Sequence, residues 1–315
     1  MSASSPSVIA VRELSYRFGT KVVLHDIAFE VPQGAFYAML GANGAGKTTL
    51  FQLLVSARPM QHGSAHVFGT PLRRLSMTQR QGVSYVAEGQ ELPRWMRLEQ
   101  MEAFCAPLYP AWDTQLAHSL RTQFDLDARQ VVGTMSRGQR MKAALLCALA
   151  PRPKLIVMDE PFTGMDVAVK DELVRGLLDA ASLEGTTVLL CSHDIAEIEP
   201  LADWVGFLDH GRIRMSESLD ALRARYKRVE LVTEPGLRLP AHLPTSWLSV
   251  ERAGLRLSVL MEQRSDERDT VSDMQGVTRR DVREASLKEL YLALSGPPRA
   301  SANCANGASC ARARQ

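Results

Sequence analysis

The glycine-rich stretch at residues 41–48 constrains the fold of this chain more than any other segment. It consists of Gly-Ala-Asn-Gly-Ala-Gly-Lys-Thr and matches the pattern G-x-x-x-x-G-K-[ST]. A continuous apolar run at residues 36–40 precedes it, and a stretch with helical character follows from residue 47 to about residue 57. The pattern therefore lies between an expected strand and an expected helix, which favours a phosphate-binding loop over a simple glycine turn.

Such a loop binds phosphate because its glycines let successive backbone N–H groups converge on phosphate oxygens, and the helix start adds positive potential. Lys47 is expected to bridge the outer phosphates, and the Thr48 hydroxyl to hold Mg²⁺. The residues predicted to form this site are Gly41, Asn43, Gly44, Ala45, Gly46, Lys47, Thr48 and Thr49.

Two acidic residues follow a second apolar run, at residues 155–158. Asp159 is expected at the carboxyl end of a buried strand, where it can hold a metal ion directly or through water. Glu160 then remains available as a general base that deprotonates an attacking water. Taken alone, this pattern also fits a strand followed by a solvated turn, but its combination with the phosphate loop favours a site.

The order of elements predicts a mostly parallel α/β core. A third apolar run, at residues 187–191, is separated from the second by a stretch with helical spacing that begins after Asp166. An antiparallel strand pair is expected before residue 32, and a helical insertion over about residues 90–150. After residue 228 the pattern changes to short strands and a closing helix.

The closing helix is expected to begin with a capping box at Ser286 and Glu289 and to end near Gly296. The tail at residues 297–315 has too little apolar content to pack, so we expect it to be disordered. The expected organisation is a phosphate-binding α/β domain at residues 1–228, a small α+β accessory domain at 229–296 and a tail at 297–315.

Over residues 8 to 228 the ordered motifs resemble the nucleotide-binding subunits of ABC transporters. Met135-Ser136-Arg137-Gly138-Gln139 resembles the family's signature segment, Thr163-Gly-Met-Asp166 its D-loop, and Ser192-His193-Asp194 its switch histidine. The resemblance implies a P-loop NTPase core of the ABC type, with an antiparallel β subdomain and a helical subdomain. It also implies ATP and Mg²⁺ as cofactors.

The resemblance further assigns roles to individual residues. Ser136, Gly138 and Gln139 would close over the ATP bound by the opposite subunit, and Asp166 would link the two sites across a head-to-tail dimer. His193 would contact the γ-phosphate, and Phe18 would stack on the adenine. Simpler alternatives remain at this point: Ser136 and Asp166 as helix caps, His193 as a structural histidine, and Phe18 as a core aromatic.

The chain departs from the family pattern at two places. Arg137 replaces a usual glycine in the signature segment, and Glu88 replaces a usual metal-contacting glutamine. Gln90, two residues further on, preserves the neutral amide, so both Glu88 and Gln90 are candidates for contact with a metal-bound water.

The composition limits the range of partners. Lys and Arg total 37 and Asp and Glu total 35, so the near-balanced charge predicts no nucleic-acid partner. Neither a secretory signal nor a run of about 18 apolar residues is present, and the five cysteines form no CxxC pair. These features fit a reducing, cytosolic setting, and the resemblance implies a peripheral location at the cytoplasmic face of the membrane, beside a separate permease.

The remaining hypotheses concern assembly. A homodimer, or a heterodimer with a related ATPase, is expected. A group of bulky residues either lines a docking groove for the permease or forms a local core; these are Trp95, Met96, Phe104, Tyr109 and Trp112.

The C-terminal pattern resembles exporter subunits, which favours export. The alternatives are a non-transport ABC ATPase in translation or DNA maintenance, whose usual second cassette, coiled-coil insertion or basic arm is not visible, and a switch with little turnover.

Overall fold

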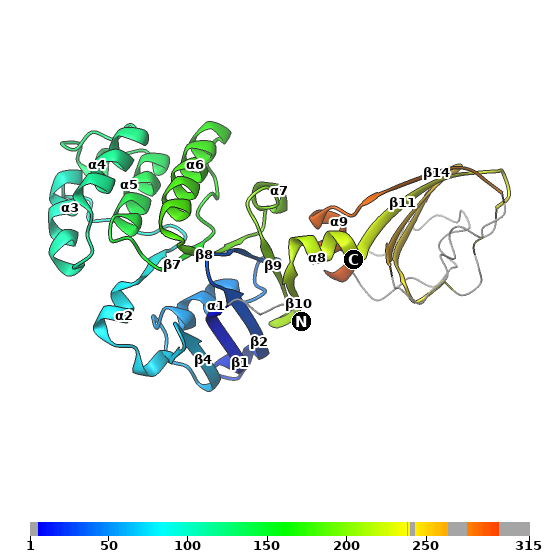
Figure 1. Ribbon diagram of the computed structural model, residues 1–315, viewed down its shortest axis with the longest axis horizontal. Coiled ribbons are helices and arrows are strands. Elements are labelled where there is room, and N and C mark those ends of the chain that lie inside the picture. The colour runs from blue at the N-terminus through cyan, green and yellow to red at the C-terminus, as the bar shows by residue number, and fades with distance from the viewer. Residues whose placement is uncertain (1–5, 238, 240–242, 264–275, 296–315) are drawn as a thin grey trace. The chain divides into compact units, whose positions relative to one another are not determined.

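The computed structural model describes residues 6–237, 239, 243–263 and 276–295. Contacts divide the chain into two compact units, residues 1–216 and 217–315 (Figure 1). By contacts, the strand after residue 225 and the short helix before it both belong to the second unit. The functional domain boundary expected after residue 228 stays a prediction.

A sheet of order β10-β9-β3-β8-β7-β6 forms the centre of the first unit. The pairings of β3 with β8, β8 with β7, and β7 with β6 are parallel, which confirms the predicted α/β core. Every residue of β3, β7 and β8 is buried, which explains why these strands are nearly continuous apolar runs. The strands are β3 (Phe36–Leu40), β6 (Val83–Val86), β7 (Leu155–Asp159), β8 (Thr187–Ser192), β9 (Trp204–Asp209) and β10 (Arg212–Ser218).

A second, antiparallel sheet of order β2-β1-β4-β5 packs beside it. It consists of β1 (Ser7–Phe18), β2 (Lys21–Pro32), β4 (His62–Val67) and β5 (Thr70–Pro71). One apolar cluster contains residues of both sheets, such as Leu14 and Phe29 from the antiparallel sheet and Leu189 from the parallel one. The antiparallel opening predicted from the alternating pattern is therefore present and shares a core with the parallel sheet.

Helices lie around the parallel sheet. Helix α1 (Lys47–Leu54) packs beside β7, and α5 (Arg137–Leu149) packs on α6 (Val167–Glu184) and on β6. In Figure 1, α3 (Leu98–Cys105), α4 (Thr114–Gln123), α5 and α6 form one group of helices, remote from β1 and β2. The remaining helical elements of this unit are η1 (Leu72–Arg74), α2 (Met77–Gln81), η2 (Ala106–Leu108), η3 (Val132–Thr134) and α7 (Ile195–Ile198).

The helical insertion buries some of its large side chains and exposes others. Leu98 and Met101 are buried, whereas the side chain of Trp95 is 78% exposed and that of Phe104 is 59% exposed. Trp95 and Phe104 are therefore not part of a local core, which was one of the two alternatives for this segment.

The second unit contains an antiparallel sheet of order β12-β13-β11-β14. Its core is formed by residues such as Val229, Leu231, Trp247 and Val259. The elements are α8 (Leu219–Arg225), β11 (Tyr226–Thr233), β12 (Trp247–Ala253), β13 (Arg256–Glu262), β14 (Val277–Glu284) and α9 (Leu287–Ser295).

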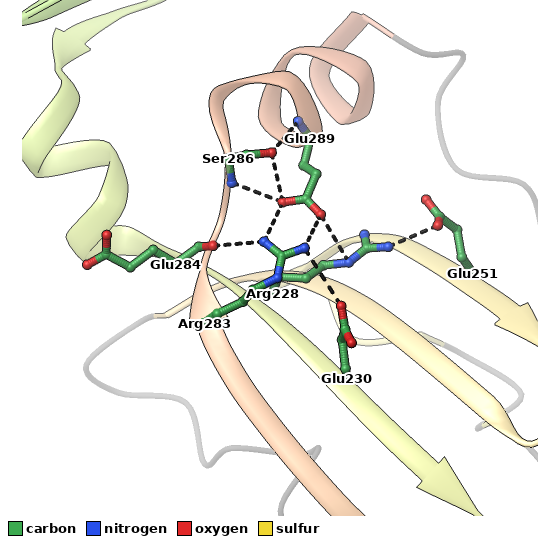
Figure 2. Close-up of polar contacts among 7 residues, drawn as sticks. All are labelled: Arg228, Glu230, Glu251, Arg283, Glu284, Ser286 and Glu289. Atoms are coloured by element: carbon green, nitrogen blue, oxygen red, sulfur yellow. Dashed lines mark hydrogen bonds and ion pairs between the residues drawn. The ribbon is translucent and has the colours of Figure 1, made fainter. Parts of the chain in front are cut away.

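A polar network joins α9 to the sheet of the second unit (Figure 2). The Ser286 and Glu289 backbone N–H groups donate to the Glu289 carboxylate and the Ser286 hydroxyl respectively, which is the predicted capping box. The Arg283 guanidinium donates to both Glu289 oxygens, at 3.0 and 2.6 Å, and Arg228 Nε lies 3.5 Å from Glu289 Oε1. Gly296 and the tail at 297–315 lie outside the described residues.

Candidate nucleotide-binding site

The glycine-rich loop connects β3 to α1 with a backbone that requires glycine at specific positions. Gly46 has φ +107°, and a Cβ there would lie 2.7 Å from Leu24 Cδ2. A Cβ on Gly41 would lie 2.3 Å from the carbonyl oxygen of Leu208. Within the described chain no side chain caps the start of α1, so its first N–H groups remain available to a phosphate.

A cavity of about 780 Å³ opens beside this loop. Phe18, Glu88 and Glu160 line it together with the loop residues Asn43, Gly44, Gly46, Lys47, Thr48 and Thr49. The described residues lining it do not include Gly41, Ala45 or Gln90. Sequence reasoning missed Lys21, His25 and His210, because only the packing of the start of β2 against the β9–β10 turn brings them to this cavity.

Phe18 lies at the edge of the cavity, at the end of β1. Its side chain is 43% exposed, so the alternative of a core aromatic does not hold. The Arg58 guanidinium lies 5.0 Å from the centre of its ring, and the Tyr16 ring meets it at 5.1 Å in an edge-on arrangement. These contacts hold Phe18 in place while part of its surface stays accessible for stacking.

Glu160 connects the phosphate loop to the end of β8. Its Oε1 lies 3.3 Å from Lys47 Nζ, and its Oε2 lies 2.8 Å from His193 Nδ1. Lys47 also donates to the carbonyl oxygen of Gly41 at 2.7 Å. The Glu160 backbone has φ +47°, a left-handed conformation that costs a non-glycine residue about 1–3 kcal/mol and often accompanies functional positions.

Asp159 is buried directly behind Glu160, and its side chain is not among those lining the cavity. The Cys191 thiol donates a hydrogen bond to Asp159 Oδ1 at 2.8 Å. Burial, and then the neighbouring Asp159 carboxylate, raise the pKa of the Tyr85 hydroxyl. That hydroxyl is buried and has no hydrogen-bond partner among the described residues, so a polar group at this end of β7 would satisfy it.

The oxygen ligands at this edge fit a magnesium nucleotide. Thr48 and Glu88 face the cavity, and the Asp159 carboxylate lies at the end of the strand next to α1. No cluster of three His, Cys, Asp or Glu residues in the described chain would hold a metal by itself. Magnesium suits such a site, since it usually takes one or two protein oxygens and completes its shell with phosphate and water. Gln90 instead accepts a hydrogen bond from the Ala87 N–H.

The signature segment forms the start of α5 and lies away from this cavity. The Ser136 hydroxyl accepts from the Gln139 N–H at 3.1 Å, and the Gln139 amide oxygen accepts from the Ser136 N–H at 2.9 Å. Asp166 likewise caps α6 by accepting from the Val169 N–H. Ser136 and Asp166 therefore act as helix caps in this structure. The described residues lining the cavity do not include Ser136, Gly138, Gln139 or Asp166, and the role of these residues toward nucleotide stays a prediction.

Arg137, the departure from the family signature, extends toward the D-loop of the same chain. A Cβ built on Gly164 would lie 2.6 Å from Arg137 Nη1, so the guanidinium covers that glycine. Gly138 is required for close packing of α5 on α6, because a Cβ there would lie 2.9 Å from Val169 Cγ1.

The fold and the cavity together define a P-loop nucleotide-hydrolase cassette with an antiparallel subdomain and a helical insertion. Comparison with known proteins gives the family. The ABC transporter family model matches residues 24–163. The phosphonates import ATP-binding protein PhnC 2 of Nostoc is 31% identical over 65% of this chain and 89% of its own length.

Two further comparisons agree. The ABC transporter ATP-binding protein YtrB of Bacillus subtilis is 23% identical over 83% of this chain and 89% of its own length. A solved ATP-binding subunit of an ABC transporter is 26% identical, covers 69% of this chain and 92% of its own, and superposes with a TM-score of 0.63. The chain therefore belongs to the ABC transporter family, as an ATP-binding and ATP-hydrolysing subunit.

The described helices include none with the length and apolar character needed to cross a membrane.

Proposed function

We propose that this chain binds and hydrolyses MgATP in the cavity beside Lys47 and thereby drives a separate membrane permease. The observation that carries the proposal is the position of Glu160. Its buried carboxylate lies between Lys47 Nζ, at 3.3 Å, and His193 Nδ1, at 2.8 Å, at the wall of the phosphate-loop cavity.

In binding, Phe18 stacks on the adenine, and the N–H groups of residues 41–49 surround the phosphates. Lys47 exchanges part of its contact with Glu160 for phosphate oxygens, which frees the carboxylate to face a water molecule. Thr48 and Asp159 would hold Mg²⁺, with Glu88 as the closest candidate for a metal-bound water. The bound Mg²⁺ supplies charge neutralisation on the phosphate oxygens.

In hydrolysis, Glu160 accepts a proton from the water that attacks the γ-phosphorus. The bond between the γ-phosphorus and the bridging oxygen breaks, and ADP and phosphate leave. His193 keeps the Glu160 carboxylate in place through Nδ1 and its own backbone N–H, at 2.8 and 3.3 Å. The same histidine is then positioned to contact the γ-phosphate.

A second copy of the cassette, or a related ATPase subunit, completes the site. The supporting observation is that Ser136, Gly138, Gln139 and Asp166 lie outside the cavity of their own chain, so they reach nucleotide only from a partner subunit. The capping box uses the N–H groups of Ser136 and Gln139, and the start of α5 then presents the N–H groups between them to the partner's γ-phosphate. ATP binding closes such a dimer and hydrolysis reopens it.

The permease docks on the helical insertion, and the complex lies at the cytoplasmic face of the membrane. Support comes from the exposure of Trp95 and Phe104 and from a cavity of about 310 Å³ lined by Tyr109, Pro110, Ala111 and residues of α2. We propose export as the direction. The basis for this direction is the C-terminal sequence pattern, which resembles that of exporter subunits.

The deciding experiment combines Glu160→Gln with purification from membranes. The variant is expected to bind ATP while losing at least about 100-fold in kcat, because the general base is absent, and to accumulate as a nucleotide-bound dimer. Detergent extraction of the wild-type chain is expected to recover a polytopic membrane protein. Unchanged hydrolysis would refute the role of Glu160, and recovery of ribosomes or DNA would favour a non-transport ATPase. Transport in inverted compared with right-side-out vesicles gives the direction.

A further inference from the structure

A buried thiol contacts the carboxylate that we assign to the metal. Cys191 and Asp159 are direct neighbours in the parallel pairing of β8 with β7. The Cys191 Sγ lies 2.8 Å from Asp159 Oδ1, and the two residues are 0% and 1% exposed respectively. The Glu160 backbone N–H donates to the Cys191 carbonyl at 3.1 Å, so Cys191 contacts both acidic residues at the end of β7.

The thiol is the hydrogen-bond donor of this pair. A thiol has a proton to donate, and its Sγ lies 2.8 Å from Oδ1, so the hydrogen bond runs from Cys191 to Asp159. The contact therefore restrains rotation of the Asp159 carboxylate and leaves the other oxygen, Oδ2, for another partner.

A purely structural role does not require a polar side chain at this position. The preceding residues of β8, Val188, Leu189 and Leu190, are buried and apolar, and the backbone ladder already joins β8 to β7. An apolar side chain such as valine would continue this pattern without a hydrogen bond. The Cys191 thiol instead resembles the hydrogen-bond donors that hold metal-binding carboxylates in place without touching the metal. Loss of such a donor typically costs about 10- to 100-fold in metal affinity.

We propose that Cys191 is a positioning residue for the magnesium site, in which its thiol fixes Asp159 Oδ1 and directs the carboxylate toward the metal that accompanies the nucleotide. The inference rests on the proposed function. It assigns to Cys191 no contact with nucleotide or metal, and its effect passes entirely through Asp159.

Two matched pairs of full-length variants test this inference. Cys191→Thr and Cys191→Val have nearly the same shape, but only threonine keeps a donor. Cys191→Ser and Cys191→Ala repeat the comparison at smaller volume, so a packing defect would follow size and a lost donor would not. Binding of a fluorescent ATP analogue is measured as Mg²⁺ is titrated, and again in EDTA, while the melting temperature reports folding.

The Val and Ala variants are expected to need about tenfold more Mg²⁺ for half-maximal enhancement of nucleotide binding. The Thr and Ser variants should stay within about twofold of wild type, and affinity in EDTA should be equal in all variants that remain folded. An equal Mg²⁺ requirement within each pair, or tighter Mg²⁺ binding without the donor, would overturn the inference. The inference would also be overturned if nucleotide binding by the wild type did not depend on Mg²⁺. A wild type that binds no nucleotide would instead refute the proposed function.

Discussion

Glu289 is predicted to account for a measurable part of the stability of the second unit. Burial alone would raise its pKa, but hydrogen bonds from Arg283 and Ser286 outweigh this effect and lower the pKa from 4.5 to about 2. At 1.36 kcal/mol per pKa unit, this difference corresponds to about 3 kcal/mol of folding free energy. Arg283 is nearly half exposed, so solvent screening reduces the expected value to about 2 kcal/mol.

The perturbation is Glu289→Gln, which keeps the shape of the capping box and removes the charge. Arg228, whose side chain is 8% exposed, then loses the Glu289 carboxylate as a partner and keeps that of Glu251. Amide hydrogen exchange of β11 and β13 at pH 7 is expected to accelerate about 30-fold, the equivalent of about 2 kcal/mol. Amides of β3 and β8 in the first unit provide an internal reference.

The pH dependence of the stability of the second unit provides a second test. Because the folded-state pKa is depressed, the stabilisation is present above pH 4.5 and is lost as the pH falls toward 2. The wild type should show this loss and Glu289→Gln should not. Glu284→Gln is the matched control. The Glu284 side chain is 62% exposed, and its Oε1 lies 3.8 Å from Lys227 Nζ, so removal of its charge should have little effect. Exchange in Glu289→Gln within twofold of wild type, or an equal effect in Glu284→Gln, would refute the reasoning.

Two further predictions concern the cassette. Phe18→Ala should weaken ATP binding about tenfold through the loss of base stacking, whereas Phe18→Trp should preserve it. Tripolyphosphate has no base, so its ability to compete for the site should be the same in Phe18→Ala as in the wild type. An equal loss of affinity for ATP and for tripolyphosphate would argue against stacking. Gly138→Ala should destabilise the first unit by about 1–3 kcal/mol, because the new methyl group meets Val169 Cγ1. Adding Val169→Ala should restore the melting temperature, and failure to do so would contradict the packing argument.

The phosphate loop could be predicted from the sequence more fully than the surface around it. The phosphate loop, the parallel strands around it and the caps at Asp166 and Ser286 could be predicted, because each is defined by neighbours in the chain. The exposure of Phe18 and Trp95 could not, since aromatic residues fit a core and a surface equally well. For Glu88 and Gln90 the sequence left both open, and the structure places Glu88 at the cavity.

The sequence by itself was enough to predict the phosphate-binding loop and the acidic pair at the end of β7, because glycine conformations and strand-to-helix order are local properties. Tertiary structure alone decided that Glu160 lies between Lys47 and His193, that Cys191 donates to Asp159, and that His25 and His210 reach the cavity. The reason is the strand order β9-β3-β8-β7, which brings together strand ends that are far apart in the chain, and the packing of the start of β2 against the turn after β9. No local pattern encodes that order.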